Sequence, residues 1–207
     1  LDYRATQVDS DGETHLNCQV TTPRQSFSVC IPALGAHMVY PALMAAAVGE
    51  LYGMTGEEIT RGVKNFLPTK MRMNVIRLPG DVVVLNDAYN ANPQSMRAAA
   101  AVLGDAKDRR KVAIVGDMLE LGPSSDLFHR AVGQSFGEMG TDCLIAVGEL
   151  ARYLAEGARE AGMGQVYRFD TLEQAMPIIL EQLRPGTTIL VKASRMMKFE
   201  RIVEALA

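Results

Sequence analysis

The 207-residue sequence contains no tryptophan, and aromatic residues make up only 6% of it. A surface that stacks nucleic-acid bases needs aromatic side chains, so such a surface is not expected here. The formal net charge of -3 also provides no positive field that would attract nucleic acid. We therefore expect no nucleic-acid partner.

Cysteine and histidine are scarce, with three residues of each. Cys18, Cys30 and Cys143 form no CxxC pair, and the histidines are equally scattered, so the sequence predicts no disulfide framework and no zinc site. No apolar run approaches the roughly 20 residues that a membrane-spanning helix needs, and no signal peptide is visible. These features favour a cytoplasmic protein with reduced thiols. Because Leu1 is not a methionine and leads directly into strand-like sequence, we expect a piece of a longer polypeptide.

Several common catalytic motifs are also missing. No GxGxxG follows the first strand of the α/β pattern described below, so a dinucleotide cofactor is not predicted. The sequence contains no GxxxxGK[ST] phosphate loop and no GxSxG nucleophile elbow.

The first third of the sequence reads as strands followed by helices. Residues 2–31 contain stretches in which polar and apolar residues alternate, as in half-buried strands, and residues 35–53 then switch to helical spacing. Thr55 is a predicted N-cap, and Glu58 three residues later completes a capping box. Pro68 ends this helical region, and residues 68–74 read as a linker.

The remainder, 74–207, shows a different pattern of short apolar strands that alternate with helices. Alternation of this kind predicts an α/β domain with a mostly parallel sheet and helices on both faces. Five strand and helix pairs are predicted, with strands at 81–87, 111–117, 143–149, 165–170 and 187–193 and helices at 93–106, 125–140, 150–162, 171–183 and 195–207. The predicted domains are therefore 1–73 and 74–207.

The polar residues of this second domain gather after the strands. Ligands of open parallel sheets bind beyond the carboxyl ends of the strands, and four of these ends lead into NDAYNANP, GDMLELG, VGELA and KASRMM. The loops at the opposite ends, such as GDAKDRR and LRPG, look merely solvated. The asymmetry predicts a ligand site at one edge of the sheet.

Individual residues at this edge allow two interpretations. Asp87 could accept hydrogen bonds from two ribose hydroxyls, or it could form an Asx turn or N-cap. Asn90 and Asn92 more often cap and turn than bind, and Pro93 supports that interpretation for the following helix. Arg195, together with Lys192, could receive a carboxylate or phosphate beside helix N-terminal amides, or the two could be a solvated surface pair.

The strings NDAYNANPQSM, VGDMLELG, LFHRAVG and ILVKASRMM together resemble the C-terminal domain of the Mur ligases. Upstream, IPALGAHMVYPALMAAAVG and TGEEITRGVKNFLPTKMR resemble the end of the central ATPase domain of that family. Within the family, the strings are most similar to those of the members that add D-alanyl-D-alanine to UDP-N-acetylmuramoyl-tripeptide. The resemblance implies a Rossmann-like fold for 74–207, use of ATP and Mg²⁺, and amide formation through an acyl phosphate in cytoplasmic peptidoglycan precursor synthesis.

The resemblance also implies roles for single residues. Asp87 matches the aspartate that holds the ATP ribose. Arg72 matches an arginine at the domain junction that contacts ATP, and His37 matches a histidine near the nucleotide, so both are expected to act in catalysis and ATP binding. The residues expected to bind or enclose D-alanyl-D-alanine are Lys192, Ser194, Arg195, Tyr89, Asn90 and Asn92.

Two features depart from the family pattern. Met38 and Pro41 stand where the family usually has asparagines near adenine. The phosphate loop, the Mg²⁺ ligands, the carbamylated lysine and the UDP-binding domain are expected upstream of Leu1, so this chain should be inactive alone, and a monomer is expected. Two alternatives stay open: another ligase of this superfamily, of the folate polyglutamate or cyanophycin type, or a non-catalytic nucleotide-binding or interaction module.

Overall fold

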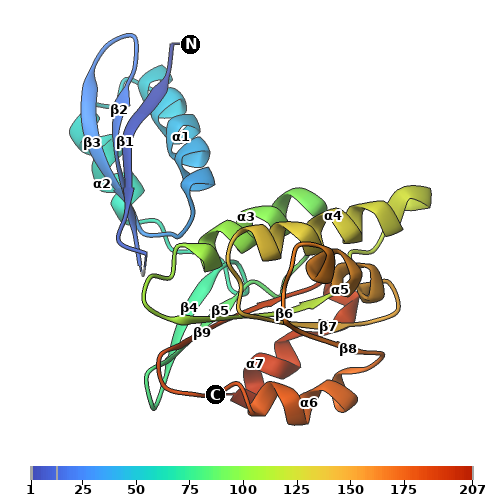
Figure 1. Cartoon of the computed structure of the whole chain (residues 1–207). Helices are drawn as coiled ribbons and strands as arrows, with labels where there is room; N and C mark the ends of the chain where they lie inside the picture. Colours follow the sequence, from blue (N-terminus) through green and yellow to red (C-terminus); the bar gives the residue numbers. More distant parts are fainter. Residues whose placement is uncertain (1, 13, 207) are drawn as a thin grey trace. The chain divides into compact units, whose positions relative to one another are not determined.

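The computed structural model describes residues 2–12 and 14–206, and the chain divides into two compact units, Leu1–Pro68 and Thr69–Ala207 (Figure 1). In the first unit, three antiparallel strands lie in the order β1-β2-β3. The elements of this unit are β1 (Arg4–Ser10), β2 (Leu16–Thr21), β3 (Ser26–Ile31), the 3-10 helix η1 (Ala36–Met38), α1 (Val39–Leu51) and α2 (Gly56–Lys64).

The core of the first unit follows from the alternation seen in the sequence. Alternate side chains of β2 are buried, because successive residues of a strand point to opposite faces of a sheet. They pack against small and branched residues of α1 and α2, and the core comprises Leu16, Cys18, Val20, Val29, Ile31, Ala42, Ala46, Ile59 and Val63. The predicted capping box of α2 is confirmed: Thr55 Oγ1 accepts from Glu58 N at 3.3 Å, and Glu58 Oε2 accepts from Thr55 N at 2.8 Å.

The second unit contains a six-stranded sheet in the order β4-β5-β9-β6-β7-β8. All neighbouring strands are parallel except β4, which runs antiparallel to β5, so the predicted mostly parallel sheet is confirmed. The strands are β4 (Asn74–Leu78), β5 (Val82–Asn86), β6 (Arg110–Gly116), β7 (Cys143–Val147), β8 (Gln165–Phe169) and β9 (Thr187–Lys192). The sequence analysis did not predict β4, whose residues are only half-buried at the sheet edge.

Helices cover both faces of this sheet, as predicted (Figure 1). One face carries α3 (Pro93–Gly104), α4 (Ser125–Glu138) and α5 (Ala151–Glu160), and the other carries α6 (Leu172–Leu180) and α7 (Glu200–Leu206). The single helix predicted for 195–207 is instead divided into the 3-10 turn η3 (Arg195–Met197) and α7. Lys198 separates them because its φ of 53° is left-handed and cannot continue a right-handed helix.

The central strands β6, β7 and β9 are almost entirely buried, as strands covered on both faces must be. Because β5, β6, β7 and β9 are parallel, their carboxyl ends lie along one edge of the sheet, which we call the carboxyl edge. None of the helices in the described part of the chain combines the length and apolar character needed to span a lipid bilayer.

Candidate functional site

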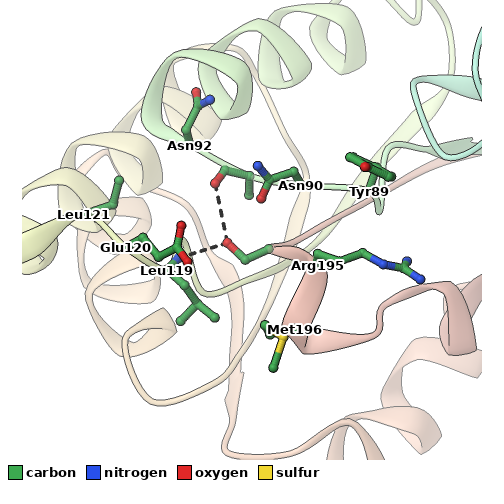
Figure 2. A pocket seen from close by; sticks show the side chains of 10 residues that line it. Tyr89, Asn90, Asn92, Leu119, Glu120, Leu121, Arg195 and Met196 are labelled. Carbon is green, nitrogen blue, oxygen red and sulfur yellow. Dashed lines mark hydrogen bonds between the residues drawn. The ribbon is translucent and has the colours of Figure 1, made fainter.

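Three turns at the carboxyl edge enclose a pocket of about 470 Å³ (Figure 2). These turns follow β5, β6 and β9, and they contain the strings YNAN, LEL and SRM. The pocket is lined by Tyr89, Asn90, Ala91, Asn92, Leu119, Glu120, Leu121, Ser194, Arg195 and Met196. Its volume falls within the range of about 300–1,000 Å³ that is usual for small-molecule sites.

Ser194 joins the three turns of the pocket. Its buried hydroxyl oxygen accepts from Leu119 N at 2.9 Å and donates to the carbonyl of Ala91 at 3.5 Å (Figure 2). Its backbone N–H donates to the carbonyl of Asp117 at 3.1 Å. Ser194 therefore positions the pocket walls, and its expected contact with the dipeptide stays a prediction.

Asp87 and Lys192 form a buried ion pair next to the pocket. Lys192 Nζ lies 2.5 Å from Asp87 Oδ2 and also donates to the carbonyl of Asn90 at 2.8 Å. The other carboxylate oxygen, Asp87 Oδ1, accepts from Met73 N at 3.1 Å. The pair forms because Asp87 follows β5 directly and Lys192 ends β9, and these two strands are neighbours in the sheet.

The environment of this pair limits what each residue can bind. Burial lowers the pKa of Lys192, and the facing carboxylate of Asp87 offsets part of that effect. The side chain of Lys192 is only 2% exposed and that of Asp87 is 13% exposed. An ionised carboxylate has about four lone-pair sites, so Asp87 keeps acceptor capacity beyond its two bonds. Lys192 anchors the turn after β5 through the carbonyl of Asn90. The expected contact of Asp87 with the ATP ribose and the expected contact of Lys192 with the dipeptide stay predictions.

Arg72 and Tyr89 contact each other, and the charge of Arg72 also acts on Lys192 of this ion pair. The guanidinium of Arg72 lies 4.2 Å from the centroid of the Tyr89 ring, a cation–π contact. Tyr89 N also donates to the carbonyl of Met71 at 3.2 Å. Met71 and Met73 have positive φ angles of 59° and 51°, which cost non-glycine residues roughly 1–2 kcal/mol each. The segment predicted as a plain linker is therefore strained backbone that is held against the turn after β5.

Asn92 is the N-cap of α3. Its side-chain oxygen accepts from Ser95 N at 2.8 Å, and Ser95 Oγ accepts from Asn92 N at 3.1 Å. Pro93 occupies the first helical position, which needs no N–H donor. The capping interpretation of Asn92 is confirmed, and Asn92 also lines the pocket. The expected binding role of Asn90 and Asn92 stays a prediction.

Arg195 lies at the start of η3 with a half-exposed side chain. One of its terminal nitrogens, Nη1, lies 3.1 Å from Glu200 Oε1 and 3.5 Å from Met71 Sδ. A guanidinium has five N–H donors, so Arg195 keeps donors for an anionic ligand. His37 lies in η1 of the first unit and is exposed, and its expected role near the nucleotide stays a prediction.

Asp117, the second residue of the GDMLELG turn, links this turn to the start of α5. Asp117 Oδ1 accepts from Ala151 N at 2.7 Å, at the start of α5. Burial raises the pKa of Asp117, and backbone N–H groups at the start of α5 offset part of the effect. Gly148 passes so close that a Cβ built on it would lie 2.4 Å from Asp117 Oδ1, and its φ of 128° also favours glycine. The turn is therefore rigidly tied to the turn after β7.

His129 holds the same turn from α4, a contact that sequence analysis missed. Its Nε2 accepts from Met118 N at 2.9 Å, so the proton is on Nδ1, which donates to the carbonyl of Ser125 at 2.6 Å. Burial lowers the pKa of His129 and favours this neutral form. The only signal in the sequence is the spacing of Ser125 and His129, one helical turn apart.

Glu120 also lines the pocket, although sequence analysis assigned it no role. The available signal was an acidic residue in a polar turn just beyond the end of β6. No group of three or more His, Cys, Asp or Glu side chains suited to a metal is found in residues 2–12 and 14–206. The expected Mg²⁺ therefore stays a prediction.

Comparison with known proteins gives consistent matches. A family model described as "Mur ligase, glutamate ligase domain" matches residues 71–195. UDP-N-acetylmuramoyl-tripeptide--D-alanyl-D-alanine ligases are similar: the one from Bacillus subtilis is 34% identical over 85% of this chain and 39% of its own length, and the one from Escherichia coli is 35% identical over 89% and 40%. This chain thus spans about two fifths of these curated relatives. A crystal structure of MurF from Acinetobacter baumannii covers 99% of this chain and 44% of its own, with a TM-score of 0.89 and 32% identity.

Proposed function

Because the chain belongs to the Mur ligase family, we propose that it forms the dipeptide-binding part of an ATP-dependent ligase that adds D-alanyl-D-alanine to UDP-N-acetylmuramoyl-tripeptide. The observation that carries this proposal is the pocket at the carboxyl edge, where the YNAN, LEL and SRM turns meet. Support also comes from the two similar proteins that carry this ligase name.

In the proposed reaction, the dipeptide amine attacks a phosphorylated peptide carboxylate, an amide bond forms, and phosphate and a proton leave. ATP, when bound, supplies the phosphoryl group that activates this carboxylate. On this chain, Asp87 would accept hydrogen bonds from the ribose hydroxyls. Arg72, which stacks on the Tyr89 ring, would contact ATP with its positive charge. The pocket would hold the dipeptide, with Arg195 bonded to the carboxylate that does not react. Such positioning can supply much of the rate of an acyl transfer.

The first unit, Leu1–Pro68, would belong to the central ATP-binding domain of the complete enzyme, and His37 would act there near the nucleotide. The predicted boundary at residue 73 differs from the unit boundary because Met71 and Met73 bond to the turn after β5. We also propose that the complete enzyme is a cytoplasmic monomer and that its Mg²⁺ ligands lie outside these 207 residues. The remaining Mur-superfamily alternatives differ in their amine acceptor. A test of acceptors therefore distinguishes them.

The test uses the complete enzyme with ATP, Mg²⁺ and UDP-N-acetylmuramoyl-tripeptide, and it measures phosphate release with different amines. We expect D-alanyl-D-alanine to support turnover, and L-glutamate, L-aspartate and L-arginine not to. Turnover with a single amino acid instead of the dipeptide would contradict the proposal, as would a complete lack of turnover. The 207-residue chain alone should release no phosphate, because its sequence contains no phosphate loop.

A further inference from the structure

The pocket at the carboxyl edge has one lining residue of each charge. Glu120 lies in the turn after β6 and Arg195 in the turn after β9, and the other eight lining residues are uncharged. Since β6 and β9 are neighbouring strands, these two turns are held side by side. In Figure 2, Glu120 and Arg195 lie on opposite sides of the view. The pocket therefore offers opposite charges at separate positions.

The backbone at Glu120 is strained and firmly held. Its φ of 64° is left-handed, a conformation that glycine or asparagine adopts at a lower cost. The preceding N–H groups are both bound, because Leu119 N donates to Ser194 Oγ at 2.9 Å and Met118 N donates to His129 Nε2 at 2.9 Å. Strain of this kind persists where surrounding structure determines it, and it often marks functional sites. Here it fixes the position from which an acidic side chain lines the pocket.

The carboxylate of Glu120 is available to a ligand. Within residues 2–12 and 14–206 it accepts no hydrogen bond and forms no ion pair. The two other carboxylates that we described at this edge are already engaged, Asp87 with Lys192 and Asp117 with the start of α5. Glu120 thus places a negative charge at the wall of a ligand-sized pocket, and no group in the described residues pairs with it.

We propose that Glu120 binds the ammonium group of the incoming dipeptide while Arg195 binds its carboxylate, so that the pair sets both the zwitterionic specificity and the direction of the acceptor. This inference rests on the proposed function. A dipeptide carries its ammonium group on one residue and its carboxylate on the next, and the Cα atoms of these residues are about 3.8 Å apart. Two charged side chains on separate turns can therefore each bind one of these groups. A reversed dipeptide would place like charges together. Hydrogen bonds between two charged groups are also the stronger kind, which gives this arrangement its selectivity.

The experiment compares Glu120→Gln with Glu149→Gln in the complete enzyme. Gln keeps the size of Glu at a strained position but removes the charge. Glu149 is an exposed residue of the turn after β7, at the same edge but outside the pocket lining, so its change controls for net charge. We expect Glu120→Gln to raise the KM for D-alanyl-D-alanine roughly ten- to hundredfold, with an unchanged KM for ATP, and Glu149→Gln to have no such effect.

A second measurement isolates the ammonium group. N-acetyl-D-alanyl-D-alanine lacks this charge, so its inhibition constant should be similar in the wild type and in Glu120→Gln. Equal dipeptide KM values for the two variants would overturn the inference, and so would a changed Mg²⁺ requirement without a changed dipeptide KM. Both outcomes leave the proposed function intact as long as the wild type uses D-alanyl-D-alanine. A wild type that does not use it refutes the proposed function and this inference together.

Discussion

The parallel strands of the second unit begin at one side of the sheet, which we call the amino edge, and end at the carboxyl edge. Each of these edges has an arginine, and the two side chains form different contacts. Arg109 at the amino edge donates to Thr188 Oγ1 at 2.9 Å, to Asp81 Oδ1 at 2.8 Å and to the carbonyls of Asp81 and Thr187 at 2.7 and 3.1 Å. Its side chain is 21% exposed. Arg195 at the carboxyl edge is 50% exposed and has one ion pair.

This difference corrects the expectation that the loops of the amino edge are merely solvated. Arg109 uses all three of its guanidinium nitrogens to join the turn before β5 to the start of β9. Arg195 uses only Nη1 within the described residues and lies at a pocket. A charged group whose bonds are satisfied by the protein stabilises the fold, whereas one with free donors beside a pocket can bind a ligand. The following predictions test this distinction.

The largest effect is expected from Lys192→Met, which removes the partner of a buried carboxylate. Breaking a buried ion pair at one side typically costs about 3–5 kcal/mol, because the other charge stays buried without a counter-charge. We expect the free energy of unfolding, measured with denaturant, to fall by about that amount. Lys107→Met, at an exposed position of the amino edge, should change it little. A small loss in both variants would show that Asp87 does not depend on Lys192.

A smaller loss of stability is expected from Arg109→Met. Hydrogen bonds to charged groups contribute roughly 1.5–3 kcal/mol, and partial exposure reduces that contribution at this site. We expect the free energy of unfolding to fall by about 2 kcal/mol, while the KM for D-alanyl-D-alanine in the complete enzyme stays unchanged. A raised dipeptide KM with normal stability would place a ligand function at the amino edge and break the comparison.

The sequence predicts local structure well where neighbouring residues decide it. Alternating strands and helices predict the parallel sheet, Thr55 and Glu58 predict a cap, and the turn strings locate the polar edge. The pairing of Asp87 with Lys192 could not be predicted, because these residues are 105 positions apart. It depends on β9, the last strand, lying between β5 and β6, and an alternating pattern carries no information on strand order.

Other parts of the site depend on backbone geometry that composition does not reveal. The left-handed conformation of Glu120 and of Met71 is set by tertiary contacts, since neither residue type favours it. The role of Arg109 was missed because a basic residue in a charged loop usually points into solvent. These cases share one cause: the number of partners that a polar side chain finds is decided by elements distant in sequence.

Arg195→Lys tests the ligand side of the comparison. Lysine keeps the charge but cannot form two parallel hydrogen bonds to a carboxylate. In the complete enzyme we expect a roughly ten- to hundredfold lower kcat/KM for the dipeptide, a nearly unchanged KM for ATP and a nearly unchanged free energy of unfolding. D-alanyl-D-alanine amide, which lacks the carboxylate, should discriminate far less between wild type and variant. Equal damage with acid and amide would mean that Arg195 has a different role.

The smallest effect concerns His129, both of whose ring nitrogens are bonded within the protein. Burial lowers the pKa of His129 in the folded state below the usual value of about 6.5, which the unfolded chain retains. As the pH falls below about 6.5, the unfolded state therefore binds a proton before the folded state does. The stability that His129 provides is fully present above that pH and declines as the pH falls towards the folded pKa, by at most about 1.4 kcal/mol per pH unit.

His129→Gln should remove this pH dependence, because glutamine retains a donor and an acceptor but does not titrate. The variant is needed because Asp117, whose raised pKa acts in the opposite direction, contributes in both proteins, and Asp126 lies nearby on the same helix. We would measure denaturant unfolding between about pH 7 and about pH 5, the range in which histidine titrates. The free energy of unfolding of the wild type should fall more steeply than that of the variant. Parallel pH profiles would mean that His129 is protonated as readily in the folded state as in the unfolded state. The hydrogen bond from Met118 N would then be replaced on protonation without a loss of stability.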